Sequence, residues 1–353
     1  MHADLSPFLR FYSGLEGAAV RLLLGSAFLR RRLARSRAGA VEGRTLSEDV
    51  AAMLGLDDID GRSDLRKLSP EEARLMVARS IAVVGPERRK DVASEDREVP
   101  ASPAPVPIRV YTPDGLEPGS PAVVYIHGGG WVTGSVATHD GLCSEIAAGA
   151  RVRVVSVEYR LAPEHPFPAA VDDCLAATRF VLAHAEELGI DPTRVAVAGD
   201  SAGGNLSAVM ARKTRKDARR PKLQALLYPA LDAVRTRGSF GTMGERYFLT
   251  SGMCDWYYDH YSKGRDVRDP DLSPLAGEDV SDVPAYIVTC GFDPLRDEGK
   301  DYADELRAAG TKVVYRELAD TVHGLLLMTR ALPSARAQTD AIIRDIGSLL
   351  REE

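Results

Sequence analysis

Short apolar runs separated by helix-length segments dominate the chain from about residue 108 onward. The runs span residues 108–111, 122–126, 152–157, 195–198, 223–227, 285–289 and 312–318. The segments 169–188 and 335–350 between and after them have the length and spacing of helices. Near-continuous apolar strands that alternate with helices are typical of a parallel sheet covered on both faces. We therefore predict an α/β fold with a mostly parallel central sheet flanked by helices.

The first 100 residues follow another pattern, which predicts helices. Apolar residues from Phe8 to Leu29 fall near helical spacing, and five arginines follow between residues 30 and 37. Ser69-Pro70-Glu71-Glu72 predicts the start of a helix that runs to Val84, because serine caps the helix and proline suits its first turn. The stretch 88–107 is charged and proline-rich, and residues 101–107 within it predict a surface connection to the next unit. We expect an N-terminal helical segment over 1–100 and a larger unit over 101–353.

Residues 233–275 interrupt the alternation of strands and helices. This stretch is aromatic and contains no obvious strand. An insertion of this length inside a compact α/β unit is usually functional, most often as a lid. We expect residues 233–275 and the N-terminal helices to form a cap over the functional site.

Charge and the spacing of metal-binding residue types exclude several classes of function. The 353 residues carry a formal net charge of -6, which offers no electrostatic basis for binding nucleic acid. The seven histidines are scattered without the spacing of metal ligands, so we expect no metal site. The four cysteines are far apart, and we interpret them as reduced, buried thiols of a cytoplasmic protein. No pattern predicts an oligomeric state.

The basic N-terminal stretch leaves two interpretations open. A secretory signal is disfavoured because the arginines follow the apolar residues instead of preceding them. A membrane-spanning helix would have to bury Glu16 and Arg21, which is energetically costly. The remaining alternatives are an amphipathic helix packed on the protein itself and a basic helix lying on a membrane surface. Base rates favour the packed helix over membrane association.

The clearest chemical signal is the sequence Gly199-Asp200-Ser201-Ala202-Gly203. An apolar strand precedes it and a helix-compatible segment, 205–213, follows it. In a nucleophile elbow the serine is held in a strained turn, and larger flanking side chains would collide with the closely packed backbone. Small residues also make ordinary turns between strands and helices, so the motif needs partners elsewhere in the chain.

A glycine-rich loop supplies candidate hydrogen-bond donors. The strand 122–126 ends in His127-Gly128-Gly129-Gly130-Trp131, where consecutive glycines leave backbone N–H groups uncovered. Such groups, with the N–H of Ala202 after the serine, can stabilise a developing oxyanion. A plain glycine-rich turn is the alternative. A phosphate-binding loop is excluded because no Gly-Lys-Ser/Thr follows.

A base and an acid follow in the order expected after a nucleophilic serine. His323 lies just past the strand 312–318, and Asp293 stands at the exit of the preceding strand. Both positions fit the chain order serine, acid, histidine of hydrolases built on a parallel sheet. Asp297, Glu298 and Asp320 compete for the role of the acid, and we prefer Asp293 because it directly follows its strand.

Together these segments resemble the bacterial hormone-sensitive-lipase-like esterases of the α/β-hydrolase superfamily. The resemblance covers about residues 105–350 and rests on 127–131, 158–169, 199–204, 293–298 and 323–324. It implies an α/β-hydrolase fold with a helical cap. It also implies roles for six residues: Ser201 as nucleophile, His323 as base, Asp293 as its orienting acid, and Gly128, Gly129 and Ala202 as oxyanion donors.

The function implied by the resemblance is hydrolysis of small acyl esters through an acyl-enzyme on Ser201, without a cofactor. The expected cap limits the acyl pocket, which favours short to medium acyl chains. A related hydrolase that cleaves amides, lactones or carbamates uses the same triad and is the main alternative. A non-catalytic binder on the same fold is less favoured because all three triad residues are present.

Overall fold

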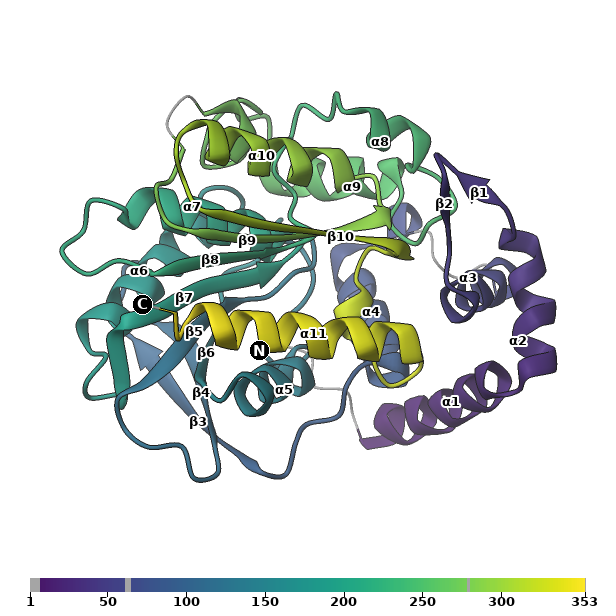
Figure 1. Cartoon of the computed structure of the whole chain (residues 1–353), viewed down its shortest axis with the longest axis horizontal. Coiled ribbons are helices and arrows are strands. Elements are labelled where there is room, and N and C mark those ends of the chain that lie inside the picture. Colours follow the sequence, from purple (N-terminus) through teal and green to yellow (C-terminus); the bar gives the residue numbers. More distant parts are fainter. Residues whose placement is uncertain (1–6, 61–64, 278–279, 353) are drawn as a thin grey trace.

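The computed structural model describes residues 7–60, 65–277 and 280–352, and the side chains of 14–58, 65–277 and 280–352. An eight-stranded sheet with the order β10-β9-β8-β7-β5-β6-β4-β3 forms its centre (Figure 1). Neighbouring strands from β10 to β6 pair in parallel, whereas β4 is antiparallel to both β6 and β3. The predicted mostly parallel sheet is confirmed. Its strands are β3 (Val92–Val99), β4 (Val106–Pro113), β5 (Ser120–Ile126), β6 (Arg153–Val157), β7 (Ile190–Asp200), β8 (Leu223–Leu227), β9 (Ala285–Phe292) and β10 (Val313–Val322).

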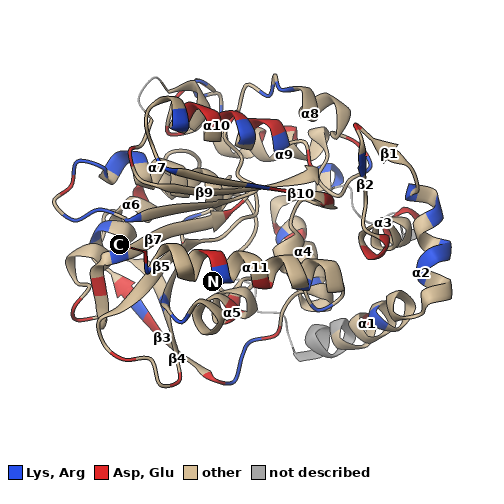
Figure 2. Ribbon diagram, in the orientation of Figure 1, with Lys and Arg blue, Asp and Glu red and all other residues tan. Residues whose placement is uncertain are grey.

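Helices cover both faces of the sheet. Helices α5 (Asp140–Ala150) and α11 (Pro333–Leu349) lie on one face, and α6 (Ala169–Ala183), α7 (Ala202–Thr214) and α10 (Arg296–Ala308) lie on the other. Strand β5 shows why both faces are covered. Its residues Val123 and Tyr125 pack with α5 and α11. The alternate residues Val124 and Ile126 pack with α6 and α7. Successive side chains of a strand point to opposite faces, so an apolar run fills two cores. Charged residues accordingly lie mostly on the surrounding helices and loops (Figure 2).

The N-terminal part is mainly helical, as predicted. It comprises α1 (Pro7–Gly25), α2 (Ala27–Ala34), η1 (Arg35–Arg37), the hairpin β1 (Ala40–Val41) and β2 (Arg44–Thr45), α3 (Glu48–Asp60), η2 (Leu65–Lys67) and α4 (Pro70–Val84). Helix α1 packs on α4, and α2 packs on α3. The capping box at Ser69 is present, with Glu72 N–H on Ser69 Oγ at 3.3 Å and Ser69 N–H on Glu72 Oε2 at 2.8 Å. The expected apolar positions Phe8, Phe11 and Tyr12 lie outside the described side chains.

The stretch 233–275, which the structure describes throughout, contains no strand, as predicted. It holds α8 (Gly238–Thr242), α9 (Ser251–Ser262) and the beginning of η3 (Pro274–Ala276). Helix α9 contacts η2 of the N-terminal part. Two segments far apart in sequence therefore meet on the same side of the molecule.

Strand β3 is not predicted by the sequence pattern. No strand is predicted between residue 88 and the expected connection at 101–107, but Val92–Val99 form an edge strand that pairs with β4 along its whole length. Its central residues are polar and mostly exposed, as suits a strand at the edge of a sheet. The stretch around residue 100 is consequently the turn of the β3–β4 hairpin, so the predicted boundary at residue 100 runs through this hairpin.

Candidate active site

The predicted elbow is a sharp turn between β7 and α7. Ser201 stands at its apex with φ 54° and ψ -118°, a conformation that non-glycine residues rarely adopt. A Cβ at residue 203 would lie 1.9 Å from the carbonyl oxygen of Ile126, and one at residue 199 would lie 2.4 Å from the same atom. Both positions therefore need glycine, because the strand β5 passes directly against the elbow.

The structure brings the predicted serine, histidine and aspartate together from three different strand ends. His323 Nε2 lies 2.9 Å from Ser201 Oγ, and His323 Nδ1 lies 2.7 Å from Asp293 Oδ2. Asp293 follows β9 and is fully buried, and its other carboxylate oxygen accepts the N–H of Leu295 at 2.9 Å. The ring of Tyr228 meets the imidazole edge-on at 4.8 Å between centroids. This arrangement fixes the orientation of the imidazole between the two partners.

Two of the three competing carboxylates accept hydrogen bonds from backbone N–H groups elsewhere. Asp297 accepts the N–H of Ser239 at 2.8 Å, and Glu298 accepts the N–H of Leu231 at 2.6 Å. Complete burial raises the pKa of Glu298 well above its ordinary value. Among the described contacts of His323, Asp293 is the only carboxylate hydrogen-bonded to the imidazole. The geometry therefore matches the preference for Asp293.

Gly128 does not have the free donor that the sequence analysis expected of it. Its N–H is donated to Asp200 Oδ1 at 3.0 Å, so this group is already used inside the protein. Within the described chain, the N–H groups of Gly129, Gly130 and Ala202 donate to no recorded acceptor, and all three residues line the same cavity as Ser201. The N–H groups available as candidate donors are therefore those of Gly129, Gly130 and Ala202, and not that of Gly128. Sequence alone could not distinguish among three consecutive glycines.

The carboxylate of Asp200 holds the first residue of the glycine-rich loop in place. Its buried carboxylate accepts the phenol of Tyr125 at 2.7 Å and the N–H of Gly128, and it lies 3.4 Å from His139 Nε2. Burial alone would raise the pKa of Asp200, but the nearby His139 and the two hydrogen bonds outweigh burial and hold this pKa below its ordinary value. The residue stays out of the triad, as expected, and fixes the start of the loop instead.

Helix α9 holds the other end of the glycine-rich loop with aromatic side chains. A Cβ at Gly130 would lie 2.2 Å from the ring of Tyr257, so only glycine lets this ring rest on the loop. Trp131 stacks on Tyr261 with centroids 4.5 Å apart and an angle of 3° between the rings. Trp131 also contacts Tyr258 at 5.1 Å. These tyrosines were not predicted to contact the loop. Their only distinguishing feature in the sequence is that they lie close together within 251–262.

A cavity of about 1000 Å³ opens above Ser201 and His323. Its walls are mainly apolar and come from both the N-terminal part and the stretch 233–275. Contributions from α1 include Val20 and Leu23, α4 supplies Leu75 and Met76, and α9 supplies Met253. A largely apolar cavity with a few polar groups at one end suits a small organic ligand.

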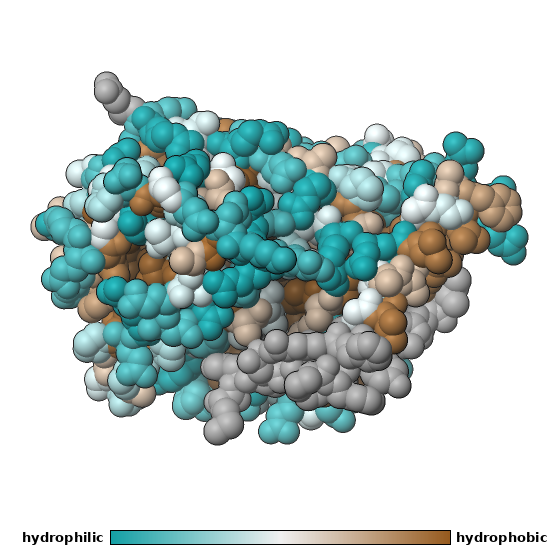
Figure 3. Space-filling view, turned by 90° about the horizontal axis from the view of Figure 1, so that it is seen from below, coloured by the Kyte–Doolittle hydropathy of each residue, from teal (hydrophilic) through white to brown (hydrophobic). Residues whose placement is uncertain are grey.

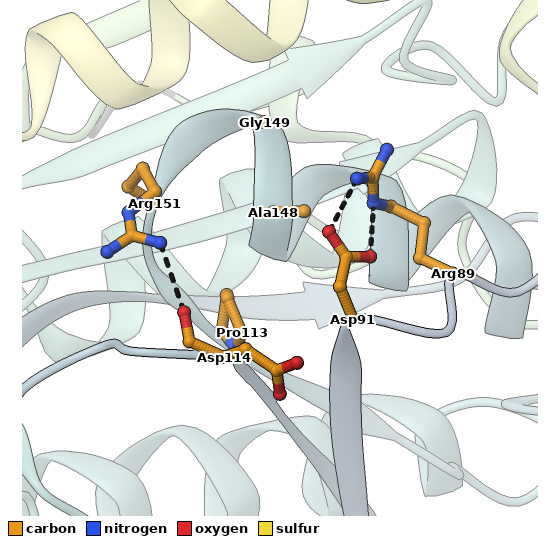
Figure 4. A pocket seen from close by; sticks show the side chains of 7 residues that line it. All are labelled: Arg89, Asp91, Pro113, Asp114, Ala148, Gly149 and Arg151. Atoms are coloured by element: carbon orange, nitrogen blue, oxygen red, sulfur yellow. Dashed lines mark hydrogen bonds and ion pairs between the residues drawn. The ribbon is translucent and has the colours of Figure 1, made fainter.

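A second, smaller cavity lies far from this chemistry. Its volume is about 160 Å³, and Figure 4 shows its lining residues Arg89, Asp91, Asp114 and Arg151 among others. Arg89 is already paired with Asp91 at 2.6 Å, and Arg151 donates to the carbonyl of Asp114 at 3.2 Å. With no serine, cysteine or histidine among its lining residues and both arginines engaged, this cavity is a poorer candidate for an active site.

Three further observations concern metal ligands, membrane-spanning helices and cysteines. Among the described residues, no group of three or more His, Cys, Asp or Glu side chains is placed to hold a metal ion. Across the same part of the chain, no helix is long and apolar enough to cross a membrane. All four cysteines are buried and free of disulfide bonds, as predicted.

A serine elbow, a histidine and an aspartate at the carboxyl ends of β7, β10 and β9 define the class of α/β hydrolases. A family model described as alpha/beta hydrolase fold matches residues 123–327. The carboxylic ester hydrolase LipN of Mycobacterium tuberculosis is 42% identical over 89% of this chain and 86% of its own. The ethyl acetate hydrolase of Pseudomonas putida is 36% identical over 82% of this chain and 95% of its own.

Two solved structures that resemble this chain are also those of ester hydrolases. An ester hydrolase from the metagenome of Lake Arreo, solved with a derivative of bipyridine phosphonate, has a TM-score of 0.82 at 36% identity. It covers 86% of this chain and 99% of its own. A thermostable esterase from Pseudomonas putida has a TM-score of 0.83 at 30% identity and covers 90% and 100% of the two chains. The chain belongs to the hormone-sensitive-lipase-like esterase family of the α/β hydrolases.

Proposed function

We propose that Ser201 is the nucleophile, His323 the general base and Asp293 the orienting acid of this enzyme. The protein is a carboxylic ester hydrolase, as are the relatives named above. The observation that carries the mechanism is the continuous chain of contacts from Asp293 through His323 to Ser201, with distances of 2.7 and 2.9 Å. This order of contacts is what a serine needs to become a nucleophile at neutral pH.

In the first step, His323 Nε2 takes the proton of the Ser201 hydroxyl while Oγ attacks the carbonyl carbon of the ester. The resulting imidazolium is stabilised by the carboxylate of Asp293, which accepts a hydrogen bond from Nδ1–H. The N–H groups of Gly129, Gly130 and Ala202 stabilise the oxyanion. Ala202 opens α7, so the positive end of the helix dipole adds to this stabilisation.

In the second step, His323 returns its proton to the leaving alcohol and then activates water. The water attacks the acyl-enzyme carbonyl, and the bond to Ser201 Oγ breaks as the proton passes back to the serine. Carboxylic acid and alcohol are the products, and the sequence of steps needs no cofactor.

The substrates we propose are small esters with short to medium acyl chains. The name of the ethyl acetate hydrolase relative supports a small acyl group, and the apolar walls of the 1000 Å³ cavity support chains longer than acetyl. We also propose that the N-terminal segment and residues 233–275 act as a cap, since both contribute walls to the cavity. In this arrangement the cap selects the substrate and the sheet edge performs the chemistry.

Replacing Ser201 by alanine tests the mechanism. We expect the turnover of p-nitrophenyl butyrate to fall about 10³-fold or more, because the oxyanion donors and binding alone cannot replace the nucleophile. Ser348→Ala, on the exposed side of α11, is the matched control and should behave as the wild type. A fluorophosphonate probe should label the wild type at Ser201 and leave the S201A variant unlabelled.

Retention of most activity by S201A would contradict the assignment. Parallel assays with p-nitroanilides and lactones distinguish an esterase from the related hydrolases. Turnover of these substrates at a higher kcat/KM than the matched ester would overturn the proposed substrate class while leaving the triad intact.

A further inference from the structure

The exposed large apolar side chains of the described chain are concentrated around the cavity and the N-terminal helices. Leu15 and Leu22 on α1 and Phe28 on α2 are 55%, 76% and 73% exposed. Leu75 and Phe248 are also exposed, and both line the cavity. Soluble proteins expose few large apolar groups together, so such a concentration marks an interaction surface.

Helix α1 is oriented so that its outer side is apolar. Leu15, Ala18, Ala19 and Leu22 follow each other at the spacing of one helix face, and all four are exposed. The opposite side is fixed to α4, because a Cβ at Gly17 would lie 2.7 Å from the carbonyl oxygen of Val83. Ala19 also belongs to the cavity lining, so the apolar face borders the cavity. Figure 3 shows hydrophobic side chains gathered at the end of the molecule where α1 and α2 lie.

The same surface is basic although the whole chain is acidic. Residues 14–37 contain six arginines and one glutamate, whereas the chain has a net charge of -6. Figure 2 shows the cations along α2. Arg31 is 74% exposed and lies 3.8 Å from Glu48, whereas Arg32 and Arg35 are exposed with no ion pair recorded to any residue the structure describes. The neighbours Arg30 and Arg37, in contrast, pair with Glu48 and Asp58. The unengaged cations make the surface complementary to anionic groups.

We propose that this face of α1 and α2 docks on an anionic lipid surface. The side chains of Leu15, Leu22 and Phe28 enter the outer acyl region, while Arg31 and Arg32 contact the headgroups. A second copy of this chain is a poorer partner, because it would bring the same arginines together. Docking places the cavity beside the lipid, so an ester dissolved in the lipid layer reaches Ser201 without crossing water. This last step rests on the proposed function, whereas the docking does not.

Vesicle sedimentation with the full-length protein tests the proposal. Wild type should sediment with vesicles of phosphatidylcholine and phosphatidylglycerol, and much less with phosphatidylcholine alone. The variant L22D/F28D should lose binding to both, and R31E/R32E should bind the anionic vesicles at least about fivefold more weakly. The charge-matched control K216E/R344E changes two exposed cations outside α1 and α2 and should sediment like wild type.

Turnover of water-soluble p-nitrophenyl butyrate should be unchanged in every variant, which shows that each one is folded. Equal sedimentation of wild type and L22D/F28D would overturn the proposal, as would the absence of wild-type binding to anionic vesicles. Concentration-dependent dimers of wild type that L22D/F28D abolishes would assign the surface to a second copy instead. Vesicle binding by a wild type that hydrolyses no ester would refute the proposed function and leave the docking supported.

Discussion

At the scale of single residues, the site depends on where a few polar groups point. The order serine, acid, histidine was readable from the sequence because each residue directly follows a strand, and the structure places the three within hydrogen-bond distance. The hydrogen bond from the Gly128 N–H to Asp200 could not be predicted from the sequence. It depends on how the Asp200 side chain, at the end of one strand, is oriented toward the loop that follows another. Local sequence reports which groups are present near a turn, and tertiary contacts decide which of them remain free.

The buried carboxyl of Glu158 gives a prediction about pH and stability. Burial raises its pKa from 4.5 to about 7. Between these values the unfolded chain loses the proton while the folded protein keeps it, so the free energy of unfolding falls as pH rises through this window. The loss amounts to about 3 kcal/mol by pH 7. Glu158→Gln cannot ionise and should escape this loss.

Urea unfolding of wild type and E158Q at pH 5 and pH 8 measures this difference. The stability of the variant relative to wild type should increase from pH 5 to pH 8. Other titrating groups affect both proteins equally and cancel in the comparison. Parallel pH profiles would show that the carboxyl of Glu158 titrates at its ordinary value.

At the scale of elements, strands with continuous apolar runs were predicted and a polar strand was not. Strand β3 reads Val-Ala-Ser-Glu-Asp-Arg-Glu-Val and has one neighbour in the sheet, so it needs little apolar surface. Its pairing with β4 supplies backbone hydrogen bonds that side-chain patterns do not report. Helix α9 is a second case, because its tyrosines acquire their importance only by resting on a loop more than a hundred residues away.

The contact between α9 and the glycine-rich loop predicts a selective loss of kcat. Tyr257→Ala removes the ring that rests on Gly130 and frees the loop that carries the proposed oxyanion donors. We expect kcat for p-nitrophenyl butyrate to fall about tenfold or more with a smaller change in KM, since the oxyanion forms only during reaction. Tyr257→Phe keeps the ring and loses only the hydroxyl contact with Thr133, so its kcat should fall much less than that of Tyr257→Ala.

Met253→Ala is the matched control for this effect. Met253 lies on the same helix and lines the same cavity. Its loss should raise KM and leave kcat nearly unchanged. An equal fall of kcat in both variants would show that α9 acts through general packing and not through the loop.

At the scale of the whole molecule, the chemistry and the substrate cavity come from different parts of the chain. The proposed catalytic groups follow strands of the sheet, whereas Val20, Leu23 and Met76 line the cavity from helices near the N-terminus. The sheet was predictable because its pattern is regular. The cavity was not, because its shape depends on how two distant segments pack against each other.

This division predicts a dependence of activity on acyl length. Each methylene buried in the apolar cavity contributes about 0.8 kcal/mol, so KM should fall by up to about fourfold per methylene from acetyl toward hexanoyl. Chains that exceed the cavity should gain nothing further. A series of p-nitrophenyl esters from acetate to palmitate measures the profile.

Two neighbouring residues supply a variant and its control for this series. Leu23 lines the cavity, so Leu23→Trp should shift the optimum to shorter chains. Leu22 is 76% exposed and does not line the cavity, so Leu22→Trp should leave the profile unchanged. A flat response of wild type from acetyl to octanoyl would show that the acyl chain does not occupy this cavity.

The close approach of the elbow to strand β5 has a consequence for how this enzyme can diverge. The carbonyl of Ile126 touches the backbone at Gly199 and Gly203, and the chain then continues directly into the glycine-rich loop. The distance between Ser201 and that loop is therefore set by direct contacts between backbone atoms. Any descendant that keeps these two glycines inherits the same spacing, however much its pocket side chains drift. New substrates can thus be acquired by changes in the proposed cap without renewed adjustment of the reacting atoms.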